Sequence, residues 1–183
     1  MSFDVITDFE NAIAKFFGAP YAVAVDCCTH GIELCLRDQE IQSITVPKRT
    51  YISVPFLASK LNIELKWKDE IWQDYYFLGD TNIIDAAVLW EKNSYIPNTF
   101  MCLSFQFRKH LSLGRGGMIL TKDPDTYSRA AAWHDHGHEN NPKLPRGEDT
   151  KTIYGFNYRM TEMQAVVGKE QLKRVDFIFE YRD

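Results

Sequence analysis

The amino-acid sequence predicts an α/β protein built on a largely parallel sheet. Short apolar segments typical of buried strands alternate along the chain with segments whose apolar residues recur at helical spacing. Such alternation favours strand–helix–strand units, whose strands run parallel. The chain has 183 residues, of which 45% are hydrophobic, which is enough for one domain with a sizeable core.

The N-terminal elements follow from apolar periodicity and from residues that stop helices and strands. The first helix should end at Gly18, because glycine adopts the left-handed conformation that closes a helix. Pro47 should close the second strand, because proline has no backbone N–H to donate. The elements expected in this part are a helix at 3–17, a strand at 21–25, a helix near 31–37, a strand at 44–46 and a helix near 54–61.

The remaining elements include two helices with clear start signals. Asp123-Pro124 is a favourable helix start, and Thr161 is a plausible cap for an amphipathic helix. A polar loop containing prolines is expected between these two helices, over 134–149. The elements expected here are strands at 63–67, 83–84, 100–105 and 117–121, and helices at 124–133 and 161–172.

Charge and cysteine content exclude several classes of protein. The net charge of −4, without a basic cluster interleaved with aromatics, gives no case for a nucleic-acid partner. No apolar run approaches membrane-spanning length, and the N-terminus lacks a signal pattern, so no membrane association is expected. Four cysteines lie in apolar segments without zinc or redox spacing, which indicates reduced thiols, no metal and a cytoplasmic location.

Polar or reactive residues follow several of the expected strands, where open α/β sheets bind ligands. Cys28 and Thr29 come after the strand at 21–25, and backbone N–H groups with a hydroxyl at a helix start can hold a phosphate. A simple helix cap is the alternative there. Asp85 ends an Ile-Ile-Asp strand, where a carboxylate can pair with a protonated pyridine nitrogen, or merely cap a turn.

Tyr51, Ser104 and Lys109 complete the candidate set. Tyr51 follows the strand at 44–46 and can stack on a cofactor ring, although a core aromatic is the commoner outcome. Lys109 lies between two buried strands, five residues after Ser104. Partial burial favours a neutral amine, which alone can attack a carbonyl, so this is a position for a Schiff-base lysine. The alternative is a surface lysine in a turn.

The order of these segments resembles the DegT/DnrJ/EryC1/StrS family of sugar aminotransferases, pyridoxal-phosphate (PLP) enzymes of the aspartate-aminotransferase fold. Their order across nearly the whole chain carries the resemblance, because each match alone is weak. The matching segments are Phe9-Glu10 with Phe17-Gly18, 21–25 leading to Thr29, Val46-Pro47 through Thr50-Tyr51, Asp85-Ala-Ala87, Ser104-Phe105 to Lys109 with Gly114-x-Gly116-Gly117, His136-Gly137, and Gly155-Phe-Asn157-Tyr-Arg159-Met160 through Gln164-Ala165 and Gln171-Leu172.

The resemblance implies a fold and a domain. The fold is a three-layer α/β sandwich with a mostly parallel central sheet, the abbreviated PLP-binding large domain of fold type I. Residues 1–183 are expected to form this single domain without the family's C-terminal small domain. The stretch between Trp67 and Asp85 is also shorter than in the family.

The resemblance also implies residue roles. Lys109 would form the Schiff base and shuttle a proton, and Asp85 would bind the pyridine nitrogen. Tyr51 would stack on the ring. The phosphate would be held by a group of residues from both halves of a homodimer, with one reaching across the interface: Cys28, Thr29, Ser104 and, from the second subunit, Asn157.

The implied activity is transfer of an amino group from glutamate to a nucleotide-linked keto sugar, with pyridoxamine phosphate as the intermediate cofactor form. The alternative is a shortened, non-catalytic relative that binds PLP or a partner subunit in a structural or regulatory role. The missing C-terminal small domain motivates this alternative. Cys28 at a position that is usually glycine, and Arg115 at one that is often glutamate, are further departures from the family pattern. Dehydration is a third possibility, but such relatives replace the Schiff-base lysine with histidine, whereas Lys109 is retained.

Two further segments have two interpretations each. His134-Asp-His136-Gly-His138 has a spacing that metal sites use, but the family match places it in an ordinary loop after a helix. The aromatic stretch of Trp67, Trp72, Tyr75, Tyr76 and Phe77 is either a sugar-stacking surface or core and interface packing.

Overall fold

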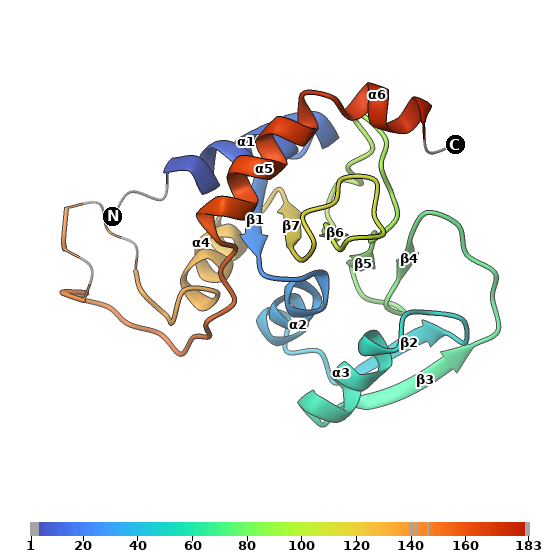
Figure 1. The fold of residues 1–183 in the computed structure, drawn as a ribbon. Coiled ribbons are helices and arrows are strands. Elements are labelled where there is room, and N and C mark those ends of the chain that lie inside the picture. Colours follow the sequence, from blue (N-terminus) through green and yellow to red (C-terminus); the bar gives the residue numbers. More distant parts are fainter. Residues whose placement is uncertain (1–3, 140, 142, 146, 182–183) are drawn as a thin grey trace.

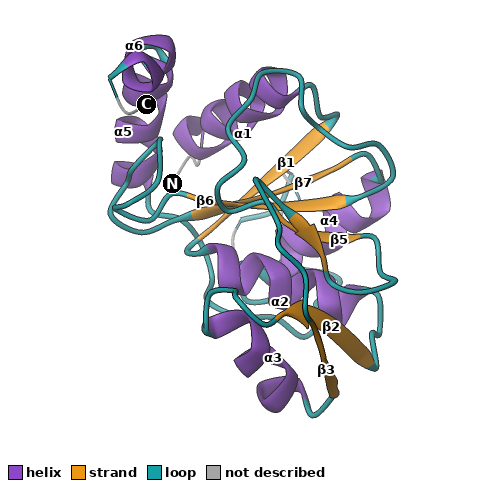
Figure 2. Cartoon of the chain, turned by 90° about the vertical axis from the view of Figure 1, so that its right-hand side faces the viewer, coloured by secondary structure: helices purple, strands orange, loops and turns teal. Residues whose placement is uncertain are grey.

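The computed structural model describes residues 4–139, 141, 143–145 and 147–181, and it shows a central sheet with helices on both faces (Figures 1 and 2). Among these residues, no helix has both the length and the apolar composition needed to cross a membrane. The elements are α1 Asp4–Phe17, β1 Tyr21–Val25, α2 Cys28–Asp38, β2 Ser43–Pro47, α3 Ser53–Leu61, β3 Glu64–Lys68, β4 Tyr76–Phe77, β5 Ile83–Asp85, β6 Phe100–Ser104, β7 Gly117–Thr121, α4 Pro124–Trp133, α5 Glu162–Leu172 and α6 Val175–Glu180.

The central sheet is mixed, which corrects the expectation of a mostly parallel sheet. Its strand order is β1-β7-β6-β5-β4, and only β5 and β6 pair in parallel. Two of the antiparallel pairs, β4 with β5 and β6 with β7, join strands that follow each other in the chain without a helix between them. The predicted parallel pairing does occur between β2 and β3, which form a separate two-stranded sheet.

The strands alternate between two hydrophobic cores, one on each face of the central sheet. In β6, Met101 and Leu103 pack with α1 and α5, whereas Phe100 and Cys102 pack with α2 and α4. The same two-residue alternation occurs in β1 and β7. Figure 2 shows the resulting layers, with α1 and α5 on one side of the sheet and α2 and α4 on the other. The predicted three-layer arrangement is therefore confirmed.

The predicted helix starts are confirmed by side-chain caps. Asp123 accepts a hydrogen bond from the Asp125 N–H at the start of α4. Thr161 and Gln164 form a reciprocal capping box at the start of α5. The predicted helix at 3–17 corresponds to α1, although Phe3 lies outside the described residues. The short strand β4 was not predicted, because two residues are too few to show periodicity.

The sheet of β2 and β3 lies apart from the central sheet, beyond α2 and beside α3 (Figure 1). Among the described residues, no strand pairing joins the two sheets. Gly79 makes a close approach between them: a side chain there would meet backbone and side-chain atoms of Thr45 at 3.1 Å. Gly79 also has a positive φ of 71°, so glycine suits both the turn and the contact.

Glu10 makes an expected contribution to pH-dependent stability. Burial raises its pKa to about 7, although the Ala24 N–H donates a 2.7 Å hydrogen bond to its carboxylate. A folded-state pKa above the unfolded value means that stability falls as pH rises from about 4.5 to about 7 and stays level above that. We expect Glu10→Gln to remove this fall and to stabilise the protein above pH 7 by on the order of 2 kcal/mol.

Urea unfolding between about pH 4.5 and pH 8 measures this effect. Asp69→Asn is the matched control, because Asp69 is an exposed acid in a surface ion pair with Lys48, and it should keep the wild-type pH dependence. If Glu10→Gln followed the wild-type curve throughout the range, Glu10 would not be the titrating group.

Candidate functional site

The candidate residues converge where several strands end above the first turn of α2. Asp85 is the last residue of β5 and pairs with Cys102 of β6. Ser104 is the last residue of β6 and pairs with Gly117, the first residue of β7. Cys28 joins α2 to this group, because its thiol donates a 3.4 Å hydrogen bond to the Cys102 carbonyl. The strand-end location expected from the sequence is therefore confirmed for these residues.

Asp85 is a buried carboxylate with both oxygens engaged. The Ala87 N–H donates to Oδ1 at 3.0 Å, and the Tyr76 hydroxyl donates to Oδ2 at 2.9 Å. Burial raises the pKa of Asp85, while these hydrogen bonds and the charge of Lys109 act in the opposite direction. A buried acid that is held by two donors near a cation is suited to bind a second cationic group.

The first turn of α2 lacks a side-chain cap from its N-cap residue. Its N-cap residue, Cys27, makes no side-chain capping hydrogen bond, so the N–H groups of the turn have no such acceptor. The Thr29 hydroxyl lies 2.7 Å from the hydroxyl of Ser53, the first residue of α3. Two helix N-termini therefore present hydroxyls at one place.

Gly117 fixes how close β7 comes to this turn. A Cβ atom at Gly117 would lie 2.5 Å from backbone atoms of both Cys27 and Cys28. Cys28 itself is the first helical residue of α2, and its side chain points into the core. The Cys28 side chain, at a position where the family usually has glycine, is accommodated here. The reason is that Gly117, and not residue 28, allows β7 to approach the first turn of α2.

Lys109 follows β6 in a turn, where its N–H donates to the Gln106 carbonyl at 2.8 Å. It is partly buried, and its charge acts on both Asp85 and Cys28. Ser104 is buried and accepts a long hydrogen bond, 3.4 Å, from the Gln106 N–H. Lys109 therefore lies close enough to Asp85 for their charges to interact, and its role as the Schiff-base lysine stays a prediction.

Tyr51 and Asn157 lie at the surface. The Tyr51 side chain is 70% exposed, and Asn157 is also exposed. The segment that carries Asn157 nevertheless runs beside the site, because the Asp26 N–H donates to the Tyr158 carbonyl at 2.7 Å. In this single chain, neither side chain is enclosed with Asp85.

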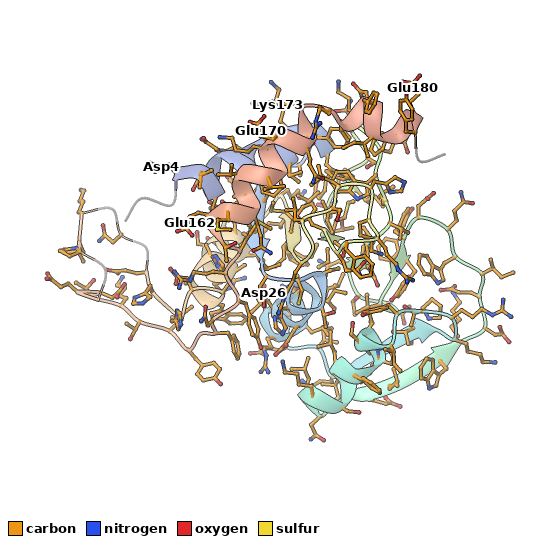
Figure 3. All side chains as sticks on the ribbon, viewed as in Figure 1. Asp4, Asp26, Glu162, Glu170, Lys173 and Glu180 are labelled. Carbon is orange, nitrogen blue, oxygen red and sulfur yellow. The ribbon has the colours of Figure 1, made fainter. Side chains whose placement is uncertain are left out.

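A group of charged residues closes one side of the α2 turn. His30 lies 2.6 Å from Asp26, stacks on the Tyr158 ring at 3.7 Å, and shares Asp26 with Arg115. Burial opposes the charged imidazole, but the Asp26 hydrogen bond prevails and raises the pKa of His30 to about 9. Burial likewise opposes the Asp26 carboxylate, yet His30 and Arg115 lower its pKa. Figure 3 labels Asp26 beside the first turn of α2.

Asp26, Cys27 and His30 also place three potential metal-ligand atoms within 4.8 Å of one another, the one such cluster among the described residues. The Arg115 guanidinium already occupies the Asp26 carboxylate. Arg115, at a position where the family often has glutamate, therefore forms an ion pair with Asp26, which precedes α2.

The histidine run at 134–138 does not converge. His134 is bonded to the Ala130 carbonyl, and His138 lies 2.7 Å from Asp149. In the part of the chain that the structure describes, these histidines do not form a cluster of three ligand atoms. The ordinary-loop interpretation fits this arrangement better than a metal site does.

The aromatic stretch is divided between core and surface. Tyr76 is buried, whereas Trp67 and Phe77 are exposed. A cavity of about 600 Å³ lies beside it, lined by Thr45, Lys68, Trp72, Tyr76 and Asp80 among others. Sugar stacking on this surface stays a prediction.

Tyr76 and Ser53 are two polar residues of the site that the sequence did not single out for it. Ser53 was detectable in principle, as a hydroxyl residue opening a predicted helix. Tyr76 was noticed only as an aromatic, because nothing in the sequence shows that it faces Asp85 across a two-residue strand.

Comparison with solved structures first defines the class of fold. The chain aligns with the sugar aminotransferase CalS13 from Micromonospora echinospora with a TM-score of 0.80 and 17% sequence identity, covering 94% of this chain and 61% of CalS13. It aligns with AtS13 from Actinomadura melliaura with a TM-score of 0.76 and 20% identity, covering 96% and 61%. The fold is the type I fold of PLP-dependent aminotransferases, which confirms the predicted fold apart from the sheet direction.

Sequence comparison then gives the family. The sequence model of the DegT/DnrJ/EryC1/StrS aminotransferase family matches residues 2–75 and 96–183, and the chain belongs to this family. GDP-perosamine synthase from Caulobacter vibrioides is 26% identical, over 93% of this chain and 57% of that protein. Spore coat polysaccharide biosynthesis protein SpsC from Bacillus subtilis is 24% identical, over 97% and 59%. The chain thus spans less than two thirds of the length of these relatives.

Proposed function

We propose that this chain is the PLP-binding large domain of an aminotransferase that transfers an amino group to a nucleotide-linked keto sugar. The observation that carries the proposal is the buried Asp85 carboxylate, which interacts electrostatically with Lys109. This carboxylate lies near the N-terminus of α2, which has no side-chain cap. Support for the substrate class comes from relatives such as GDP-perosamine synthase.

The residues present fit PLP at both of its ends. Asp85 offers a buried carboxylate to the pyridine nitrogen, and the uncapped turn of α2 offers N–H groups to the phosphate. Thr29 and Ser53 add hydroxyls at two helix N-termini, and Ser104 ends the neighbouring strand β6. When bound, PLP supplies an aldehyde and an electron-withdrawing ring that stabilises negative charge on the substrate carbon.

The chain's own residues then have distinct tasks. The Lys109 amine holds the aldehyde and afterwards moves a proton to and from the substrate carbon. Asp85 orients the ring and maintains its positive charge. The α2 turn anchors the phosphate and so keeps the ring in register with Lys109.

A homodimer is part of the proposal. Tyr51 and Asn157 would contact the cofactor within a shared active site, Asn157 from the second subunit. Large exposed apolar side chains in the α3 and α5 regions support this, because subunit interfaces bury exposed apolar surface. They are Tyr51, Ile52, Phe56, Met163, Val166 and Val167.

Glutamate is the proposed amino donor, and the cytoplasm is the proposed location, in keeping with four free cysteines. Residues 1–183 are proposed to form the large domain alone, without the family's small domain. The donor half-reaction needs no sugar, so it tests the proposal without knowledge of the acceptor.

The experiment is an absorbance titration of the purified protein with PLP, followed by glutamate. We expect a saturable visible band that glutamate bleaches and that a keto acid restores. A band that glutamate leaves unchanged would favour the non-catalytic role, and the absence of any band would overturn cofactor binding.

A further inference from the structure

The Asp85 carboxylate is held by Tyr76 of β4, and both residues lie in the stretch that the family model does not match. Tyr76 in β4 stands directly opposite Asp85 in β5, and its hydroxyl donates to Oδ2 at 2.9 Å. Tyr76 is 4% exposed and Asp85 is 5% exposed, so water does not compete for this hydrogen bond. The family match stops at residue 75 and resumes at 96.

The Tyr76 hydroxyl has a second partner. The Thr50 hydroxyl lies 2.6 Å from it. A phenol has one proton, and Tyr76 donates that proton to Asp85. Thr50 is therefore the donor to Tyr76, and the three groups form a directed relay from Thr50 through Tyr76 to Asp85.

The same segment also holds the backbone before Tyr51. The Trp72 indole N–H donates to the Arg49 carbonyl at 2.6 Å, and the Trp72 and Tyr76 rings lie 5.1 Å apart. Two hydrogen bonds, at residues 49 and 50, therefore fasten the loop that carries Tyr51 to the segment opposite Asp85.

We propose that Tyr76 and Thr50 are positioning residues that keep Asp85 ionised and oriented, and that couple it to the loop of Tyr51. The role in catalysis rests on the proposed function, whereas the effect on Asp85 does not. The other titratable groups that act on Asp85 are Lys109 from the loop after β6, Cys28 from α2 and Cys102 from β6. Unlike the charge interactions of these three groups with Asp85, that of Tyr76 is a side-chain hydrogen bond donated to the carboxylate.

Removal of the hydroxyl in Tyr76→Phe tests the first part. The ring stays to pack against Trp72, but the carboxylate loses a buried donor. We expect the pKa of Asp85 to rise by about one to two pH units, because a hydrogen bond to a charged group favours the ionised form by about that amount. Carboxyl ¹³C NMR of the full chain without added PLP measures it, and Asp85→Asn identifies the resonance.

Tyr75→Phe is the matched control. Tyr75 is the preceding residue and packs against the opposite core, on the side of α1. It should leave the Asp85 titration unchanged. Thr50→Val should shift the titration in the same direction as Tyr76→Phe but less, and it replaces that variant if the phenylalanine chain does not fold. An Asp85 titration that is the same in wild type and in a folded Tyr76→Phe or Thr50→Val protein would overturn the proposal.

The second part is tested by kinetics of the glutamate half-reaction. We expect Tyr76→Phe to lower kcat by about tenfold or more while KM for glutamate changes little, because orientation of the ring and not donor binding is lost. Equal losses in Tyr76→Phe and Tyr75→Phe would contradict a positioning role. If the wild-type chain binds no PLP, the proposed function fails, and the NMR shift still decides whether Tyr76 controls Asp85.

Discussion

Replacement of Lys109 by alanine is expected to slow the glutamate half-reaction by about a thousandfold or more, because one side chain supplies both the nucleophile and the proton carrier. Borohydride reduction of the PLP-loaded protein should attach the cofactor covalently to the peptide that contains Lys109. The variant should lose this adduct. Peptide mass mapping after reduction measures it directly, without reference to the sugar substrate.

The matched control is Lys122→Ala. Lys122 is an exposed lysine directly after β7, so its removal should change neither the adduct nor the rate. An adduct that persists in Lys109→Ala at another lysine would show that Lys109 is not the Schiff-base residue. Since Lys109 has polar or electrostatic partners in the unloaded chain, thermal unfolding of both variants should accompany the assay.

The second large effect is structural. Gly117→Ala is expected to destabilise the protein by about 3 kcal/mol or more, because the new methyl group would lie 2.5 Å from backbone atoms of Cys27 and Cys28. Neither side can retreat easily: Gly117 pairs with Val25 of β1 and with Ser104 of β6, and Cys28 begins α2. PLP affinity should fall as well, because the displaced turn is the proposed phosphate anchor.

Urea unfolding measures the loss of stability, and an absorbance titration measures the loss of affinity. Gly114→Asn is the control, in the turn before β7, because nothing lies within 4 Å of a Cβ there and asparagine tolerates the positive φ of 77°. It should cost less than about 1 kcal/mol. If Gly117→Ala proved as stable as the control, the close approach of β7 to α2 would be wrong.

The elements that the sequence predicted are those with a local signal, either an apolar run or a residue that starts or stops a helix or strand. The strand at 21–25 and the helices at 124–133 and 161–172 each carry apolar runs or capping residues, and the structure has all three. The direction of the strands was not predictable in the same way, because pairing depends on which distant edge accepts a strand. β7 inserts between β1 and β6, and no local signal encodes that choice.

The candidate site shows the same division. The motif order was enough to select Asp85, Ser104 and Lys109. The structure places Asp85 and Ser104 at strand ends and Lys109 in the turn that follows β6. The contact between Tyr76 and Asp85 was not predicted, because it depends on the register between β4 and β5, and β4 has only two residues. Exposure of Tyr51 and Asn157 could not be anticipated either, since burial depends on the whole assembled surface.

The separation of the β2 and β3 sheet from the central sheet has a consequence for local unfolding. The unit of β2, α3 and β3 shares no strand hydrogen bonds with the rest of the described chain, and side-chain packing and the hydrogen bonds at Arg49 and Thr50 attach it. We expect this unit to open locally at a lower free energy than global unfolding. Thr50 and Tyr51 lie inside this unit, whereas Asp85 and Lys109 lie outside it. Local opening of this unit would therefore move Thr50 and Tyr51 away from the site, whereas Asp85 and Lys109 would keep their places in the folded remainder of the protein.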